Sequence, residues 1–144
     1  MTDALDSGVC NIAAALPKMA RLQPQTLAVV FPTGFDHDGR RTYSRLTYQQ
    51  LDVQSDAIAC GLRASGLTRG MRTVLMVKPS LEFFALTFAL FKAGIVPVMI
   101  DPGLGLKQLK TCLAEVEPEA FIGIPAAHAA RIVLGWGRKT IRHL

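Results

Sequence analysis

The chain has 144 residues, half of them hydrophobic, and a formal net charge of +5. This length suits one domain or one piece of a larger domain, and the apolar content is high for a small chain in water. The surplus charge lies after Glu119, beyond which there are no acids, so it marks a basic end of the chain and not a basic surface stripe. The basic residues of this end are Arg131, Arg138, Lys139 and Arg142. With only one tryptophan among them, this pattern is typical of a solvated terminus, so we expect no nucleic-acid binding.

The cysteine content and the apolar runs limit the compartment. Cys10, Cys60 and Cys112 are an odd number without a Cys-x-x-Cys pair. Disulfide scaffolds and zinc sites need more cysteines, so we expect buried, reduced thiols and a cytoplasmic location. The longest uncharged apolar run, residues 83–91, is far shorter than the roughly 20 residues that cross a bilayer, so no transmembrane segment is expected.

The front of the chain has the pattern of a helix followed by a β-hairpin. Residues 11–22 are predicted to be helical, and Pro17 either kinks this helix or restarts it in a first turn. Residues 27–31 and 42–47 are predicted strands, joined through the Asp-Gly pair of residues 36–41, which favours a tight turn. The Asp-His-Asp run in that turn has metal-binding side chains, but without a further ligand cluster a turn is the better interpretation.

A second helix is predicted from Thr47 to Gly66. Thr47 and Gln50 form the pattern of a capping box, and Gly66 stands where a left-handed helix end is wanted. One face of this helix is almost wholly apolar and consists of Tyr48, Leu51, Ser55, Ile58 and Leu62, of which only Ser55 is weakly polar.

The next segment alternates buried strands with helices. Residues 73–77 are predicted to form a strand buried on both faces, and Ser80 and Gly94 bound a helix over residues 81–93. The polar residues of that helix do not share one face, so it needs cover on nearly every side. We expect this second layer to come largely from sequence beyond Leu144.

The remaining elements complete an alternating order. Residues 96–100 are predicted to form another buried strand, 106–116 a helix, 120–124 a strand and 126–134 a helix. Because short linkers between such elements produce parallel strands with right-handed crossovers, the sequence predicts an α/β fold. This fold is a doubly wound, mostly parallel sheet with flanking helices and an N-terminal antiparallel hairpin.

No local motif supplies chemistry. Residues 101–105 follow a strand and carry two glycines, but they lack the third glycine of a dinucleotide fingerprint. Residues 135–140 end somewhat like a phosphate loop with the wrong glycine spacing. His37, His128 and His143 are scattered, with no nucleophile motif beside them, and His128 is expected on a helix surface. No catalytic, cofactor-binding or metal-ligating residue is therefore assigned.

The order of these weak signals resembles the beginning of the adenylate-forming superfamily, which includes acyl-CoA synthetases, fatty-acyl-AMP ligases, peptide-synthetase adenylation domains and luciferases. The resemblance spans roughly residues 11–125. The matching segments are LTYQQL (46–51), GLRASGLTRG (61–70), KPSLEFFA (78–85), LFKAGIVPV (90–98) and Asp-Pro (101–102). Met71 departs from the family pattern, since many members have Asp directly after the glycine that corresponds to Gly70. Residues 77–103 are most similar to the fatty-acid-type ligases, especially the AMP-dependent β-lactone synthetases of bacterial olefin biosynthesis.

The resemblance implies that the chemistry lies elsewhere. Family members use a Gly/Ser/Thr-rich phosphate loop, an adenine-binding element, a ribose-binding Asp and a catalytic Lys on a C-terminal lid, and none of these patterns occurs in residues 1–144. Residues 1–144 are thus expected to be the N-terminal subdomain of an AMP-binding synthetase or ligase domain, truncated before the phosphate loop. The turn at residues 101–103 then only closes a strand. ATP and Mg²⁺ would be bound by the full-length parent and not by this segment.

The function implied by the resemblance is ATP-dependent activation of a long-chain β-hydroxy acid and conversion of the acyl-adenylate to a β-lactone. A fatty-acyl-CoA synthetase, a fatty-acyl-AMP ligase and a non-catalytic α/β interaction fragment remain open as alternatives. The acceptor is an internal hydroxyl, CoA or a carrier protein. The implied partners are the acid substrate, the remainder of the same polypeptide and other enzymes of the hydrocarbon pathway.

Overall fold

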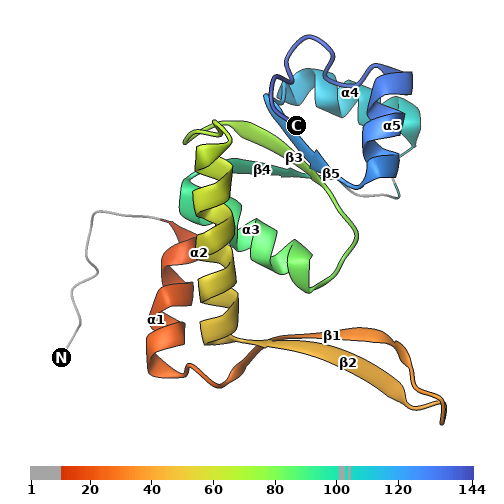
Figure 1. Cartoon of the computed structure of the whole chain (residues 1–144). Coiled ribbons are helices and arrows are strands. Elements are labelled where there is room, and N and C mark those ends of the chain that lie inside the picture. Colours follow the sequence, from red (N-terminus) through yellow and green to blue (C-terminus); the bar gives the residue numbers. More distant parts are fainter. Residues whose placement is uncertain (1–10, 101–102, 104) are drawn as a thin grey trace.

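The computed structural model, which describes residues 11–100, 103 and 105–144, confirms the predicted fold class. A three-stranded parallel sheet has helices on both faces, and an antiparallel hairpin precedes it in the chain (Figure 1). Helices α1, α2 and α3 lie on one side of the sheet, and α4 and α5 lie on the other. None of the described helices is long and apolar enough to cross a membrane.

The first helical segment has a 3₁₀ turn, η1 (Ile12–Ala14), followed by α1 (Ala15–Leu22). The side chain of Asn11 accepts a hydrogen bond from the backbone N–H of Ala13 at 2.9 Å and donates one to the Phe91 carbonyl at 2.7 Å. Pro17 is the third residue of α1. Of the two sequence interpretations, the restart in a first turn is therefore the one observed, because a first-turn residue needs no N–H donor.

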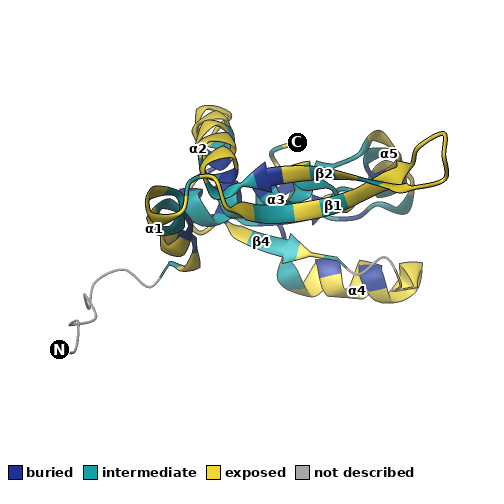
Figure 2. Cartoon of the chain, turned by 90° about the horizontal axis from the view of Figure 1, so that it is seen from below, coloured by how far each residue is buried: buried dark blue, intermediate teal, exposed yellow. Residues whose placement is uncertain are grey.

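Strands β1 (Leu27–Phe35) and β2 (Arg41–Thr47) form the hairpin, and β1 extends beyond its predicted end. The Asp36 carboxylate accepts hydrogen bonds from the backbone N–H groups of Asp38 and Arg40, at 2.9 and 2.8 Å, and Gly39 has φ +76°. This is the predicted turn chemistry. The hairpin extends away from the helices (Figure 1), and its buried colour in Figure 2 is confined to the end that joins α2.

Helix α2 (Tyr48–Ala64) begins at the predicted capping box, with reciprocal hydrogen bonds between Thr47 and Gln50 of 3.0 and 3.2 Å. The helix ends before Gly66, whose φ of +89° is the left-handed conformation expected there. Its buried residues are Leu51, Ser55 and Ala59, in agreement with the predicted inner face.

Strand β3 (Arg72–Met76), helix α3 (Leu81–Ala93) and strand β4 (Val96–Met99) form the first crossover. Helices α4 (Leu106–Val116) and α5 (Pro125–Leu134) flank strand β5 (Ala120–Gly123) in the chain. The strand order is β4-β3-β5, with both pairs parallel. The chain steps from β3 to β4 in one direction and from β4 past β3 to β5 in the other. Helices α3 and α4 lie on opposite faces of the sheet (Figure 1), as the rule of right-handed crossovers requires for two connections that run in opposite directions.

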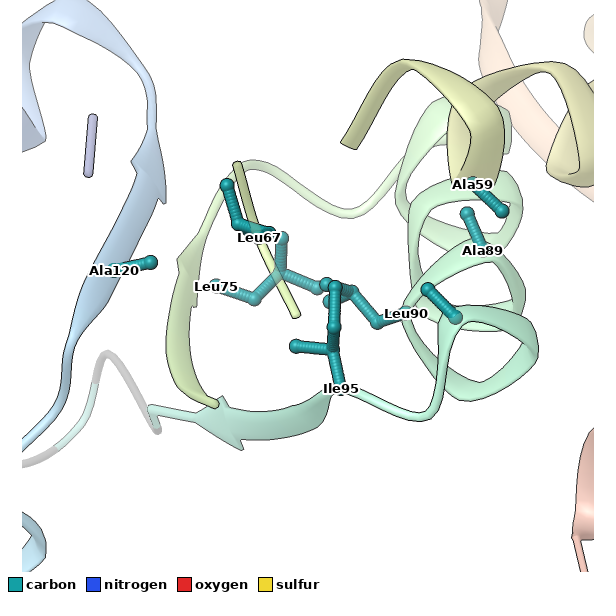
Figure 3. Close-up of a cluster of buried hydrophobic side chains, with 8 residues drawn as sticks. Ala59, Leu67, Leu75, Ala89, Leu90, Ile95 and Ala120 are labelled. Atoms are coloured by element: carbon teal, nitrogen blue, oxygen red, sulfur yellow. The ribbon is translucent and has the colours of Figure 1, made fainter. Parts of the chain in front are cut away.

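Two apolar clusters occupy the two faces of the sheet, since alternate residues of a strand point to opposite sides. Leu75 and Ala120 face the first cluster, with residues of α2 and α3 (Figure 3). Val74 and Phe121 face the second, with Leu109, Leu113 and Trp136. A third cluster joins α1, α2, α3 and the hairpin around Leu16, Leu46, Leu51 and Ala85.

Two sequence expectations about the burial of β4 and of the cysteines were wrong. Strand β4 is not buried on both faces, because it is the edge strand of the sheet and leaves Val96 and Met99 exposed. Cys60 and Cys112 are exposed free thiols on α2 and α4, where the predicted burial ignored which helix face each occupies; Cys10 lies outside the described residues. Helices α1 and α2 and the hairpin of this chain supply part of the second layer against α3, and the share from beyond Leu144 stays a prediction.

The C-terminal segment is fixed to the sheet. Trp136 is buried in the second cluster, and the backbone N–H of Phe121 donates to the His143 carbonyl at 3.0 Å. Ala120 and His143 form a parallel bridge beside β5. Arg138, Lys139 and Arg142 are exposed, so the predicted solvation of the basic residues holds for these three, while Arg131 is half-buried above the Phe121 ring.

Candidate functional site

In the described part of the chain, the hollow whose position best suits ligand binding lies at the carboxyl edge of the parallel sheet. Ligands of open α/β sheets bind outside the carboxyl ends of strands, where neighbouring crossovers leave toward opposite faces. Here α3 leaves β3 toward one face and α4 leaves β4 toward the other, so the two helices separate at the sheet edge. The space between them is a pocket of about 420 Å³, within the size range of ligand sites.

The lining of this carboxyl-edge pocket is almost entirely apolar. It is formed by the ends of the strands, the segment after β3 and the facing sides of α3 and α4. Its members are Leu75, Met76, Val77, Lys78, Pro79, Phe83, Met99, Ile100, Leu106, Leu109 and Ile124. Lys78 is the one charged residue among them and is itself exposed. Leu106 and Met99 at the rim are 61% and 50% exposed. The pocket therefore offers hydrophobic contact and little hydrogen bonding.

The start of α3 stands beside this pocket and has its own local electrostatics. The Ser80 hydroxyl caps the helix by accepting from the Phe83 backbone N–H at 3.3 Å. Hydrogen bonds from the Ser80 side chain and then from its own backbone N–H hold the pKa of Glu82 below its ordinary value, because both favour the ionised carboxylate. Glu82 is exposed and not a lining residue of the pocket, so it stabilises the helix start and is not placed to act on a ligand there.

A second charged group joins α2 to α3. Lys92 Nζ lies 2.6 Å from a carboxylate oxygen of Asp52 and 2.8 Å from one of Asp56, and it also donates to the Asp52 carbonyl at 3.0 Å. The Lys92 side chain is only 10% exposed, so these contacts satisfy a nearly buried charge. All three donors of the ammonium group are thereby used, and the arrangement is structural.

The Asp-His-Asp run of the hairpin turn brings together the only potential metal-ligating trio found among the described residues. All three side chains are exposed, and one Asp36 oxygen already accepts the two backbone N–H groups of the turn. The interpretation as a turn therefore stands.

Of the two glycine-bearing segments, residues 101–105 and 135–140, the structure fully describes only the second. Asp101, Pro102 and Leu104 lie outside the described residues, so the turn after β4 stays a prediction. In the segment 135–140, Gly135 and Gly137 have positive φ and Trp136 between them is buried, which makes this segment the end of α5 and not an open loop of amides.

The histidines remain apart from one another. His128 is half-buried against the Phe121 ring at 5.1 Å, which corrects the expected surface position. His143 contacts the sheet beside β5 and lies close to Gly66. His37 is in the hairpin turn.

Sequence reasoning did not find the carboxyl-edge pocket. Its lining comes from three strand ends and two helices, and each lining residue belongs to an ordinary apolar pattern of its own element. The one available signal was topological: the predicted order of strands implied a carboxyl edge at which residues 77–79 and residue 100 would meet.

Comparison with known proteins identifies a family, similar relatives and similar solved structures. The family model described as "AMP-binding enzyme" matches residues 16–140. The chain is 54% identical over 129 residues to the olefin beta-lactone synthetase of Xanthomonas campestris, covering 89% of this chain and 23% of that protein. The chain thus spans about a quarter of the length of that relative.

Solved structures agree on the fold. The Mycobacterium tuberculosis fatty acyl CoA synthetase superposes with a TM-score of 0.75 at 26% identity, over 92% of this chain and 26% of that one. The N-terminal subdomain of Klebsiella oxytoca NpsA, in complex with 3-hydroxybenzoyl-AMSN, has a TM-score of 0.75 at 17% identity, over 100% of this chain and 32% of that one. At that identity the likeness concerns the fold alone.

Proposed function

Because the chain belongs to the AMP-binding enzyme family, we propose that it is the N-terminal part of an ATP-dependent, AMP-forming enzyme that activates a carboxylic acid. The substrate is a long-chain β-hydroxy acid, and the product is a β-lactone formed in the biosynthesis of olefins. The observation that carries the proposal is the 54% identity to an olefin beta-lactone synthetase over nearly the whole chain.

The chemistry of this reaction explains why adenylation is needed. A carboxylate oxygen of the acid attacks the α-phosphorus of ATP, and pyrophosphate leaves with the electrons of the broken P–O bond. In the acyl-adenylate, AMP is a good leaving group where the free carboxylate has none. The β-hydroxyl oxygen of the same molecule then attacks the carbonyl carbon, loses its proton and expels AMP. Because the nucleophile is already attached to the substrate, proximity supplies much of the rate.

The residues described here do not fit a site for ATP and Mg²⁺. Among them, the one potential metal-ligating trio is at an exposed hairpin turn, and the glycine-bearing segment 135–140 encloses a buried tryptophan. We therefore place the phosphate-binding and metal-binding residues, and all catalytic residues, in the remainder of the parent polypeptide. Residues 1–144 form the N-terminal subdomain of the parent, before its phosphate loop, and the parent acts in the cytoplasm beside other enzymes of the hydrocarbon pathway.

Two alternatives differ in the acceptor. A fatty-acyl-CoA synthetase transfers the acyl group to the thiol of CoA, and a fatty-acyl-AMP ligase transfers it to a carrier protein or stops at the adenylate. The structural likeness to a fatty acyl CoA synthetase favours the first of these as the second candidate. A chain that ends at Leu144 in the cell would instead support a non-catalytic fragment.

The test is a product assay on the full-length parent. Purified protein is incubated with Mg-ATP and a long-chain β-hydroxy acid, and pyrophosphate release is measured together with the acyl product by mass spectrometry. We expect a product that has lost one water relative to the acid, formed without CoA. The matched control is the acid of the same length without the β-hydroxyl, which should yield the adenylate but no lactone. A CoA-dependent thioester as the main product would support the second candidate instead.

A further inference from the structure

We propose that helix α5 docks its exposed face on the surface of an anionic phospholipid bilayer, with the basic residues after the helix facing the lipid headgroups. The inference goes beyond the proposed function and does not depend on it, because this surface, and not the site of the reaction, would recognise the bilayer. It describes a helix that lies on a membrane and does not cross one.

The first support is the inverted polarity of α5. Its exposed residues are all apolar and lie within an arc of about 120° around the helix axis. They are Pro125, Ala126, Ala129, Ile132 and Val133. Ile132 and Val133 are 69% and 82% exposed. The two polar residues of the helix, His128 and Arg131, are half-buried against the ring of Phe121. A helix that faces water has the opposite arrangement, so this face suits apolar surroundings.

The second support is the sign of the charges beside this face. Arg138, Lys139 and Arg142 are exposed and follow α5 closely in the chain. No acid follows Glu119 in the sequence, and the Glu119 carboxylate itself lies 4.0 Å from the guanidinium of Arg72. One sign of charge beside an apolar helix face is the pattern of a helix that lies at the surface of an anionic bilayer.

The third support is a small hollow at the end of α5 that brings aliphatic and basic side chains together. It has a volume of about 230 Å³ and is lined by Arg131, Ile132, Gly135, Trp136 and Arg138. Arg131 Nε and Trp136 Nε1 are buried N–H donors without an acceptor among the described residues. The Arg131 carbonyl, by contrast, already accepts from the backbone N–H groups of Gly135 and Trp136. This end of the helix therefore lacks acceptors, which the phosphate oxygens of a lipid headgroup would supply.

Two other exposed apolar side chains are placed less well for an anionic surface. Phe35 is 66% exposed at the end of the hairpin, but Asp36 and Asp38 beside it are also exposed, and anionic lipids repel carboxylates. Val53 is 62% exposed on α2, next to Asp52. The exposed α5 face has two large aliphatic side chains together and no carboxylate in its own helix.

An acidic protein partner would match the basic charge as well. Protein interfaces, however, are anchored by aromatic side chains and carry hydrogen bonds across the contact. The exposed α5 face has neither an aromatic nor a polar side chain. Contact with lipid needs neither of them, so a bilayer is the occupant that this face favours.

The first test measures binding of the full-length parent to lipid vesicles by co-sedimentation. The vesicles contain phosphatidylcholine alone or a mixture with phosphatidylglycerol. We expect binding to the mixed vesicles to be tighter by about tenfold or more and to weaken with added salt, which screens exposed charges. Ile132→Gln with Val133→Gln should weaken it by about tenfold or more, because both side chains lose their burial in lipid. Arg138→Gln with Lys139→Gln should have a similar effect, since each basic residue near an anionic surface contributes about fivefold.

Two variants on the other side of the sheet are matched controls (Figure 1). Lys18→Gln with Arg21→Gln removes the same charge from exposed residues of α1, and Val53→Gln removes an exposed valine from α2. Both should bind the mixed vesicles as wild type does, within about twofold. Wild-type parent that stays in the supernatant with mixed vesicles overturns the proposal and leaves this surface to a protein partner. Losses as large in the controls as in the α5 variants overturn it as well.

The second test asks whether lipid covers α5 itself. Val133→Cys places a thiol on the exposed α5 face, while Cys60 is an exposed thiol on α2 and serves as the internal control. The rate of alkylation of each thiol by a water-soluble reagent is read by peptide mass spectrometry, with and without mixed vesicles. We expect the vesicles to slow alkylation at position 133 by about fivefold or more and to leave Cys60 unchanged. A thiol at position 133 that the vesicles do not protect, or one that is unreactive without them because other residues of the parent cover it, overturns the proposal.

Discussion

Gly94 is the position at which a single substitution tests the placement of α3 and β4. Its φ of +71° and ψ of +19° let the chain turn from the end of α3 into β4. In this conformation its N–H bonds back to α3, and its carbonyl accepts a hydrogen bond from Gly70 at 2.9 Å. The turn therefore has partners on both sides and cannot relax freely.

The cost of Gly94→Val can be worked out from this geometry. A side chain in the left-handed region costs roughly 1–2 kcal/mol, and a β-branched side chain raises the cost toward about 3 kcal/mol. A Cβ atom at position 94 would also lie 2.9 Å from Cγ of Arg69. Arg69 is exposed and flexible, so it can move aside. We expect a total loss of roughly 1–3 kcal/mol, most of it backbone strain.

The assay is urea unfolding followed by circular dichroism, at a concentration where light scattering shows one species. Gly61→Ala is the matched control, because Gly61 is inside α2, has no atom within 4 Å of its Cβ position and should gain about 0.5–1 kcal/mol. Repeating Gly94→Val in an Arg69→Ala background separates collision from strain. An unchanged midpoint for Gly94→Val refutes the assigned turn, and full recovery in the Arg69→Ala background refutes strain as the cause.

Two further predictions concern the C-terminal segment and the start of α3. Trp136→Ala should lower the free energy of unfolding by about 3–5 kcal/mol, because Trp136 is 3% exposed in the second cluster, whereas Arg138→Ala at an exposed neighbour should change it by less than about 0.5 kcal/mol. Ser80→Ala should raise the pKa of Glu82 toward its ordinary value in an NMR titration, since Ser80 is the largest cause of the lowering. Because the pKa of Glu82 is lowered in the folded state, its ionised carboxylate adds to the free energy of unfolding at pH values above the unfolded-state pKa. This contribution is lost as the pH falls through the folded-state pKa, so Ser80→Ala should reduce the loss of stability on acidification over that pH range. An unchanged Glu82 titration would contradict the cap.

Local signals predicted the element boundaries well where a cap or a glycine defines them. The capping box at Thr47 and Gln50 gave the start of α2, and Ser80 and Gly94 gave both ends of α3, because these side chains and backbone angles act within one helical turn. The alternation of helices and strands gave the parallel sheet, since handedness leaves few topologies.

The errors arose where the answer depends on neighbours far away in the chain. The apolar run of β4 predicts burial but not that β4 is an edge strand with one partner. Cys60 and Cys112 are apolar enough to be expected inside, yet each is exposed on its helix. The part of the cover of α3 that comes from α1 and the hairpin likewise depends on a packing of three elements that no periodicity records. The carboxyl-edge pocket was missed for the same reason.

The most direct test of the central claim, that residues 1–144 are part of an adenylate-forming enzyme whose ATP site lies beyond them, is a calorimetric titration with Mg-ATP. The 144-residue chain and the full-length parent are titrated side by side, with light scattering on both. We predict that the parent binds Mg-ATP, that the isolated chain releases no heat of binding, and that the chain self-associates through apolar side chains such as Leu106 and Met99, which it leaves exposed. Micromolar binding of Mg-ATP by a monodisperse, monomeric 144-residue chain would contradict the claim.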